Sequence, residues 1–350
     1  MVDSTDNNDA WSLYPYEPNK PAPMVFAVLL TILGSYQIYQ SFVRYHWKKY
    51  GFTFTWATTV WISGFVCRSI SVYNVQAVNI FIAQFVLVLM GPPLYAAAEY
   101  FILGRLLAYL PYHTPIHPGR VFSTFIMLSV IVETLTANGA ANSAGSSDRD
   151  PGQVKSGLAC LKAALILQCF IEAFFFSLVT YMEYKCRKAK NFPRKVRIVC
   201  YTLYITSFML LVRCIVRTIE GFEAAFCATG EGPPGYCGSV SMHEYFLYIF
   251  EIANITLFVA ILVIFHPGKY LPRDTKIFLD PIDGKTERMG PGFSKADKRP
   301  LFVTIVDPFN IGSIVSGKGM VLDKFWEQQQ PAYEGGELPK DDGKTVEMSE

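Results

Sequence analysis

The chain has 350 residues, of which 51% are hydrophobic and only 17% are charged, and its formal net charge is +2. So few charges, together with the long apolar segments described below, argue against a large soluble helical protein. The net charge by itself identifies no partner, because the charged residues are segregated along the chain rather than spread evenly.

Seven apolar segments, each at least about 20 residues long, follow one another along the chain. A helix rises 1.5 Å per residue, so each segment is long enough to cross a hydrocarbon core of roughly 30 Å. Backbone amides in lipid must be paired within their own segment, which favours a helix in every case. We therefore predict an all-α polytopic membrane protein with a bundle of seven transmembrane helices. The predicted spans are residues 24–43, 52–72, 78–101, 121–141, 157–182, 198–220 and 243–265.

The loops between these segments alternate in positive charge. The loops after the first, third and fifth segments hold 12 Lys and Arg residues, whereas the N-terminal arm and the loops after the second, fourth and sixth segments hold 3. Positively charged loops stay on the cytoplasmic side of a membrane, so we predict the N-terminus outside and the C-terminus in the cytoplasm. Residues 1–23 are polar and acidic and do not resemble a cleavable signal, which leaves the first helix as the targeting signal.

Three regions follow from this reading of the chain. Residues 1–23 are predicted to form an extracellular arm, residues 24–265 the transmembrane domain, and residues 266–350 a cytoplasmic tail. The tail is rich in Pro, Gly, Lys and Asp, so we predict that it is largely disordered. We expect an integral, multi-pass protein of the plasma membrane, with another endomembrane as the alternative. The oligomeric state is left open.

Two cysteines lie in the loop that is predicted to be extracellular. Cys227 and Cys237 flank a turn-rich stretch, and an oxidising compartment favours a disulfide between them. Such a bridge, if unstrained, would contribute roughly 2–4 kcal/mol to stability. The alternative is two free thiols. The spacing of the cysteines and the small number of histidines do not supply a full ligand set, so we expect no metal and no cofactor.

Charged residues inside the predicted spans form a layer in the outer half of the membrane. They are Arg68, Glu133, Arg213, Arg217, Glu220, Glu244 and Glu251. Unpaired charges in lipid are unfavourable, so these side chains should pair or line a wet cavity. Arg213 and Glu251 have similar predicted depths on consecutive helices, and we expect them to form a salt bridge. The other two arginines should pair with Glu220 and Glu244, which leaves Glu133 as the carboxylate without a partner.

The inner half of the membrane holds a second set of polar residues. Glu172 lies about 15 residues into the fifth segment, with Gln168 one turn before it. Glu99 lies near the cytoplasmic end of the third segment, where Arg105 is its expected partner. Each of these residues can be read as part of a substrate site or as a structural contact that holds the bundle together. The whole charged set, spread over several helices, favours a functional pocket.

Gly91, Pro92 and Pro93 interrupt the third segment near its middle. Proline lacks an amide donor and clashes with the preceding turn, so two in succession are predicted to kink or break the helix. Broken helices at mid-depth often form substrate sites in transporters. The alternative is a kink that only shapes the packing.

Several motifs of this chain are similar to those of one family of fungal proteins. They are Gly64-Phe65-Val66-Cys67-Arg68, the stretch from Gly91 to Arg105, Arg213 to Glu220, His243 to Tyr248, and His266-Pro267-Gly268. Over residues 14–268 the sequence resembles the fungal lipid-translocating exporter family, seven-helix proteins linked to aminocholesterol resistance and to export of sphingoid long-chain bases. The chain departs from the family pattern at Trp61, where a glutamate is frequent, and at Thr136, where a glutamine is frequent.

The resemblance implies transport or binding of amphipathic lipids linked to stress or drug resistance, with membrane lipids as partners. A sphingoid base carries an ammonium group, so we predict that Glu133 receives it while the paired charges hold the site open. The alternative function is a seven-helix receptor or lipid sensor that signals through its basic cytoplasmic loops, in which case the tail would contact a cytoplasmic partner.

Other chemistries are not expected. Gly312 to Lys318 approaches a phosphate-binding loop, but Gly319 stands where Ser or Thr should bind the magnesium ion. The five histidines lie mostly at loops and interfaces, which argues against an intramembrane metalloenzyme. We therefore expect no catalytic residues and no nucleic-acid partner.

Overall fold

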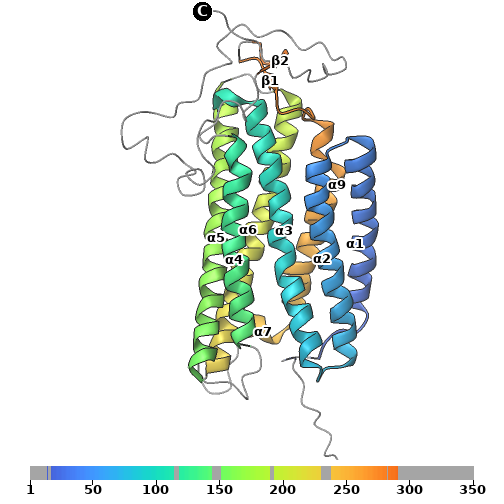
Figure 1. Cartoon of the computed structure of the whole chain (residues 1–350), viewed down its shortest axis with the longest axis vertical. Helices are drawn as coiled ribbons and strands as arrows, with labels where there is room; N and C mark the ends of the chain where they lie inside the picture. The colour runs from blue at the N-terminus through green and yellow to red at the C-terminus, as the bar shows by residue number, and fades with distance from the viewer. Residues whose placement is uncertain are drawn as a thin grey trace, which may run out of the picture.

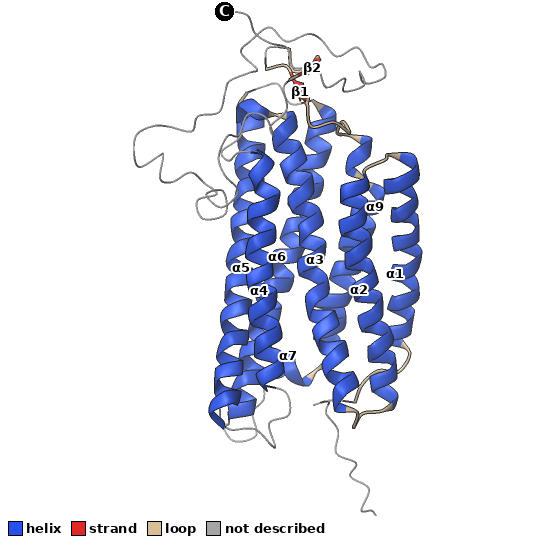
Figure 2. Cartoon of the chain, in the orientation of Figure 1, coloured by secondary structure: helices blue, strands red, loops and turns tan. Residues whose placement is uncertain are grey.

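The computed structural model describes Tyr14 and residues 17–113, 118–143, 151–189, 193–229, 238–281 and 283–290. Within these residues, seven long helical segments run side by side in one bundle, and a small hairpin lies at one end (Figures 1 and 2). The predicted all-α, polytopic fold is therefore confirmed. The first six long helices are α1 (Ala22–Ile38), which a π-helical segment (Tyr39–Arg44) continues, α2 (Lys48–Tyr73), α3 (Val78–Tyr109), α4 (Pro118–Ser143), α5 (Pro151–Lys188) and α6 (Arg194–Thr229).

The seventh crossing is built from several pieces. After the short α7 (Ser239–Met242), it comprises α8 (Glu244–Phe246), a π-helical segment (Leu247–Ala253) and α9 (Asn254–Ile264). Strands β1 (Ile277–Leu279) and β2 (Glu287–Met289) follow it. Short π-helical segments within helices are found frequently at functional sites, and this one was not predicted from the sequence.

Six of the seven crossings are long and apolar enough to span a membrane within the part of the chain that the structure describes. The remaining one, α2, has 26 residues and the length of a span, but its apolar content is lower because it is rich in Ser and Thr. Their hydroxyl groups donate to backbone carbonyls one turn earlier, as Thr58 does to Phe54 at 2.9 Å and Ser69 to Phe65 at 2.9 Å. Five of the seven Ser and Thr hydroxyl groups of α2 are satisfied in this way within the helix, which favours its placement in lipid.

Consecutive helices are neighbours in space, and α9 packs against both α1 and α6, which closes the bundle. Contacts between distant residues show which helix ends lie together. The amide of Asn19, before α1, donates to Glu244 at 2.8 Å, whereas Ser41 and His266, near the other ends of the first and last crossings, lie 3.1 Å apart. The start of the first crossing and the end of the last crossing therefore lie at opposite ends of the bundle, as an odd number of crossings requires.

The hairpin is attached to the end of α3. Strands β1 and β2 pair antiparallel, with Phe278 opposite Arg288, and Arg288 donates to Asp280 at 2.6 Å. Tyr109 at the end of α3 donates to Glu287 of β2 at 3.0 Å. The first residues of the predicted tail are therefore ordered against the bundle, while residues 291–350 lie outside the described part of the chain.

The third segment was predicted to be kinked or broken, and the break is wrong, because α3 continues through Gly91, Pro92 and Pro93 without interruption. A kink stays a prediction. Pro92 has no amide to donate to the carbonyl of Val88, but the indole N–H of Trp61 from α2 donates to that carbonyl at 3.2 Å. A side chain at position 91 would overlap the Trp61 ring, so the glycine allows this close approach. A neighbouring helix thus satisfies the group that proline leaves unpaired.

The predicted disulfide involves Cys237 and the side chain of Cys227, both of which lie outside the described part of the structure. It stays a prediction.

Candidate functional site

The first ion pair of the predicted charged layer joins the second crossing to the last. Arg68 near the end of α2 is only 4% exposed, and its guanidinium donates to Glu244 at the start of α8 at 2.9 Å. The same guanidinium lies over the ring of Tyr14 at 5.7 Å and donates to Gln84 of α3 at 3.4 Å. The arginine therefore ties the N-terminal arm, α2, α3 and α8 together.

The arginines of the second and third ion pairs both lie on α6. Arg213 is 1% exposed and donates to Glu251 at 2.8 Å, so the predicted contact between these residues is confirmed. Arg217, one turn later, donates to Glu220 at 2.8 Å and also lies 3.8 Å from Glu251. Glu251 thus lies between two arginines, and it belongs to the π-helical segment of the last crossing. The additional residue in that turn changes the direction of side chains relative to a regular helix.

Arg213 has unused hydrogen-bonding capacity. Within the described residues, its Nε and Nη1 atoms are buried and have no hydrogen-bond partner. Buried guanidinium donors without partners are unfavourable unless water or a ligand reaches them. The network therefore contains donors that a bound polar group is able to satisfy.

Glu133 does not join this network. It is half-buried in α4, and no ion pair or hydrogen bond connects its side chain to any other residue that the structure describes. The structure therefore brings six of the predicted charged residues together in three pairs and leaves the seventh apart from them. This is the arrangement that the sequence predicted for Glu133, whereas its role in binding a substrate stays a prediction.

Two further carboxyl groups of the bundle are buried, those of Glu172 and Glu99. Glu172 of α5 is 1% exposed and accepts a hydrogen bond from Tyr100 of α3 at 3.0 Å. Glu99 is fully buried and accepts from Ser207 of α6 at 3.4 Å. The expected pairing of Glu99 with Arg105 is wrong, because Arg105 points to the helix end and donates to backbone carbonyls there.

A small cavity of about 10 Å³ borders Glu172, and Tyr100 and Gln168 also line it. A single water molecule needs roughly that volume, so no lipid headgroup fits there. The sequence singled out Glu172 and Gln168 but missed Tyr100, since only the packing of α3 against its neighbours brings its hydroxyl to Glu172. The substrate role predicted for Glu172 is not tested by this geometry.

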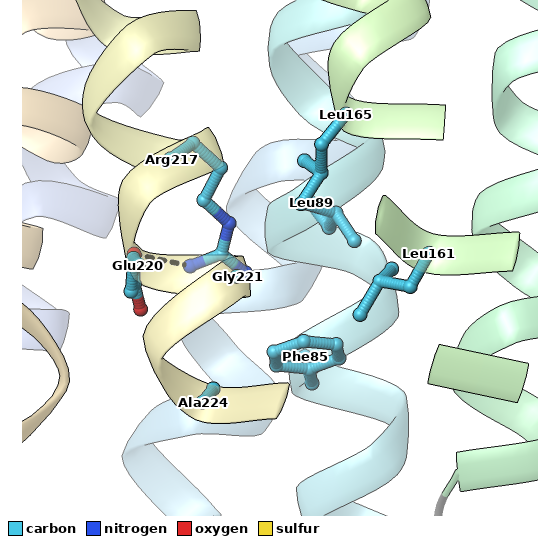
Figure 3. A pocket seen from close by; sticks show the side chains of 8 residues that line it. All are labelled: Phe85, Leu89, Leu161, Leu165, Arg217, Glu220, Gly221 and Ala224. Atoms are coloured by element: carbon cyan, nitrogen blue, oxygen red, sulfur yellow. Dashed lines mark hydrogen bonds and ion pairs between the residues drawn. The ribbon is translucent and has the colours of Figure 1, made fainter. Parts of the chain in front are cut away.

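A second cavity lies beside the ion pair of Arg217 and Glu220, between α3, α5 and α6 (Figure 3). It has a volume of about 60 Å³, and Arg217 and Glu220 form its polar side. The remaining lining residues are apolar or lack a side chain, and they are Phe85, Leu89, Leu161, Leu165, Gly221 and Ala224. A side chain at position 221 would overlap Leu165, so Gly221 keeps the two helices close. The cavity has room for a few atoms of an apolar group next to an ion pair.

No group of three or more potential metal-ligating side chains occurs among the described residues.

The sequence matches the family described as RTA1 like protein over residues 54–274, which is more than half of the chain. The chain belongs to the RTA1-like family. The matched region runs from within α2 through the whole seventh crossing, and thus includes the three ion pairs of the charged layer. The family predicted from the sequence motifs is therefore confirmed.

Several curated proteins are similar to this RTA1-like chain. A lipid-translocating exporter-like protein RTA1 from Leptosphaeria maculans is 29% identical over 348 residues, which cover 95% of this chain and 65% of that protein. Protein RTA1 of Saccharomyces cerevisiae is 27% identical over 293 residues, 74% of this chain and 86% of that protein. Protoporphyrin uptake protein 1 of the same yeast is 28% identical over 213 residues, 59% of this chain and 64% of that protein. No solved structure matches the chain.

Proposed function

We propose that this protein moves amphipathic lipids across a membrane without changing them chemically. Two things support the proposal: the polytopic bundle with polar residues buried along its length, and the relatives named lipid-translocating exporter-like proteins. The chain spans 65% of the length of the first of these relatives, so their activity is carried over here as a proposal only.

The proposed substrate is a cationic amphiphile, such as a sphingoid long-chain base, and its transport would contribute to stress or drug resistance. The observation that carries this proposal is the half-buried carboxyl group of Glu133, which has no cationic partner among the described residues. An unpaired carboxylate in lipid must be protonated or bind a cation. The ammonium headgroup of a sphingoid base is such a cation, and the lipid substrate itself carries it to Glu133.

The arginines have a different proposed role. Each guanidinium already lies beside a glutamate, so the three pairs together leave no net positive charge to attract an anionic headgroup. We propose that they hold α2, α6 and the last crossing at fixed distances while Glu133 on α4 takes the substrate amine.

Replacing Glu133 by glutamine tests the assignment. The change keeps the shape of the side chain and removes its charge, so we expect transport of a labelled sphingoid base to fall roughly 10- to 100-fold, the factor associated with one charged hydrogen bond. The measurement is flipping in vesicles that contain only the purified protein, with labelled phospholipid as a second probe. Yield and monodispersity should remain unchanged.

Glu183→Gln is the matched control, since it also removes one carboxylate, but one that pairs with the exposed guanidinium of Arg187 near the end of α5. The assignment is wrong if Glu133→Gln transports normally while Glu172→Gln does not, because the substrate carboxylate would then lie in the inner half. If the purified protein moves no lipid in any variant, and the lipid has an effect only when a cytoplasmic partner is added, the receptor or sensor alternative replaces transport.

We also propose that the N-terminus and α7 face the outside of the plasma membrane and that the hairpin end faces the cytoplasm. The charge asymmetry of the loops supports this orientation. In sealed cells, a protease site inserted before residue 14 should be cleaved from outside, and one inserted between α5 and α6 should be protected. Cleavage of the N-terminal site only after permeabilisation contradicts the orientation.

A further inference from the structure

We propose that the hairpin end of the bundle binds the phosphate-bearing headgroup of an anionic phospholipid. An open cavity of about 440 Å³ lies there between the start of α2, the end of α3 and the segment that follows α9. We call it the basic pocket, and the lining residues that matter are Trp47, Lys48, Lys49, Arg105, Arg273 and Asp274. Its volume falls within the range of roughly 300–1,000 Å³ that is typical of ligand sites.

The charges in the basic pocket are not balanced by the protein. Four cationic side chains line it, against the single acid Asp274. Lys48, Lys49 and Arg273 are exposed and form no ion pair with any residue that the structure describes. Like charges that converge without a counterion repel one another, so an anion is the missing partner.

The N-terminus of α2, which borders the basic pocket, is a second and independent reason to expect an anion there. No side chain caps the start of α2, and its first turn contains two lysines and no acidic residue. Cations are unfavourable at a helix N-terminus, where the helix dipole and the free backbone amides favour an anion. A phosphate group at this position would contact the lysines and the free amides together.

The base of the basic pocket is fixed in position. Trp47 is 5% exposed, and the guanidinium of Arg105 stacks on its ring at 5.1 Å. Arg105 also donates to the carbonyl of Pro272 at 2.9 Å and to that of Arg273. Two helices and the segment after α9 are therefore held around the cavity in the unliganded protein, so little reorganisation is needed for binding.

The position of the basic pocket favours a lipid over a free anion. The first, third and seventh crossings end at Arg44, Tyr109 and Lys269, beside the pocket, so it lies at the level of the headgroups. The apolar surface of Trp47 and Phe101 would contact the part of the lipid next to its phosphate. Basic pockets between helix ends on the cytoplasmic side of membrane proteins bind anionic headgroups in this way.

The test uses the full-length protein in nanodiscs of phosphatidylcholine, with a phosphatidylinositol monophosphate as the probe and native mass spectrometry to count bound lipid. We expect one retained probe molecule per chain. The double variant Lys48→Gln/Lys49→Gln should bind roughly 30-fold more weakly, as expected for two lost contacts between basic residues and an anionic headgroup. Both lysines are exposed, so the variant should fold normally.

The matched control is Arg194→Gln/Lys195→Gln, which removes the same charge from exposed residues at the start of α6, outside the pocket. This control should bind the probe like the original protein. Equal loss of binding in both double variants would overturn the proposal, because the attraction would then come from the overall surface charge. Full competition by an equal concentration of inorganic phosphate would overturn the lipid as the ligand.

A third variant separates binding from stability. Lys48→Glu places an acid in the first turn of α2, which the helix dipole favours, so the melting temperature without anionic lipid should rise. The same variant should lose the stabilisation that the probe gives to the original protein. If Lys48→Glu is still stabilised by the probe to the same degree, the pocket is not the binding site.

Discussion

Replacing Arg213 by alanine is expected to destabilise the bundle by roughly 3–5 kcal/mol, because removing one partner of a buried ion pair leaves the other charge uncompensated. Arg213 is 1% exposed and lies 2.8 Å from Glu251. Arg217 also lies 3.8 Å from Glu251, but it donates to Glu220 at 2.8 Å, so it compensates only part of the Glu251 charge. The expected result is a large loss of monodisperse protein after extraction and a lower unfolding temperature.

The double variant Arg213→Ala/Glu251→Ala is the control for this prediction. It removes both charges, so it should be more stable than Arg213→Ala alone, and the two substitutions should be strongly non-additive. If the single variant is as stable as the original protein, water or lipid compensates Glu251 and the pair is not required for folding. Transport assays on Arg213 variants are informative only if the protein folds.

Replacing Trp61 by alanine is expected to be almost as damaging, at roughly 3–5 kcal/mol, the usual effect of truncating a large buried aromatic residue. The side chain is fully buried, and its indole N–H donates a hydrogen bond to the carbonyl of Val88, which Pro92 leaves without a backbone donor. Trp61→Phe keeps an aromatic ring and removes the donor together with part of the ring system, so it should have a smaller effect than Trp61→Ala, of about 1–3 kcal/mol. Thermal unfolding in detergent measures both.

Gly91 provides a second, coupled test of this contact. In the original protein, Gly91→Ala should destabilise by about 1–3 kcal/mol, because the new methyl group overlaps the Trp61 ring. In a Trp61→Ala background the same substitution should be nearly neutral, since the space is then empty. Equal effects of Gly91→Ala in both backgrounds would show that the cost arises within α3 rather than from Trp61.

The length of the apolar segments and the spacing of the charges were sufficient to predict the bundle and the ion pair between Arg213 and Glu251. Arg68 and Arg217 were expected to pair with Glu220 and Glu244 as a set, and only the structure shows which partner each one has. Arg213 and Arg217 lie one turn apart on one helix, and Glu251 could reach them because consecutive helices are neighbours. The prediction combines the spacing of residues within one helix with the rule that charges buried in lipid must pair. The same logic correctly left Glu133 without a partner within the described residues.

Features that depend on contacts between distant helices were not predicted. Two prolines in the sequence indicate a break, and only the position of Trp61 on α2 shows how the helix continues. The hydrogen bond from Tyr100 to Glu172 and the attachment of the hairpin through Tyr109 likewise join residues more than 70 positions apart. No periodicity or spacing within one segment encodes such contacts.

The pairing of the three arginines with three glutamates has a consequence for the membrane potential. These pairs carry no net charge, so an electric field across the membrane exerts no net force on them. Moving one elementary charge through the full potential changes the free energy by about 2.3 kcal/mol per 100 mV. With a cationic lipid on Glu133, as proposed, the loaded site is neutral, and the empty site is neutral as well because the carboxyl group then holds a proton. Exchange of the ammonium group for a proton would therefore be electroneutral and insensitive to the membrane potential.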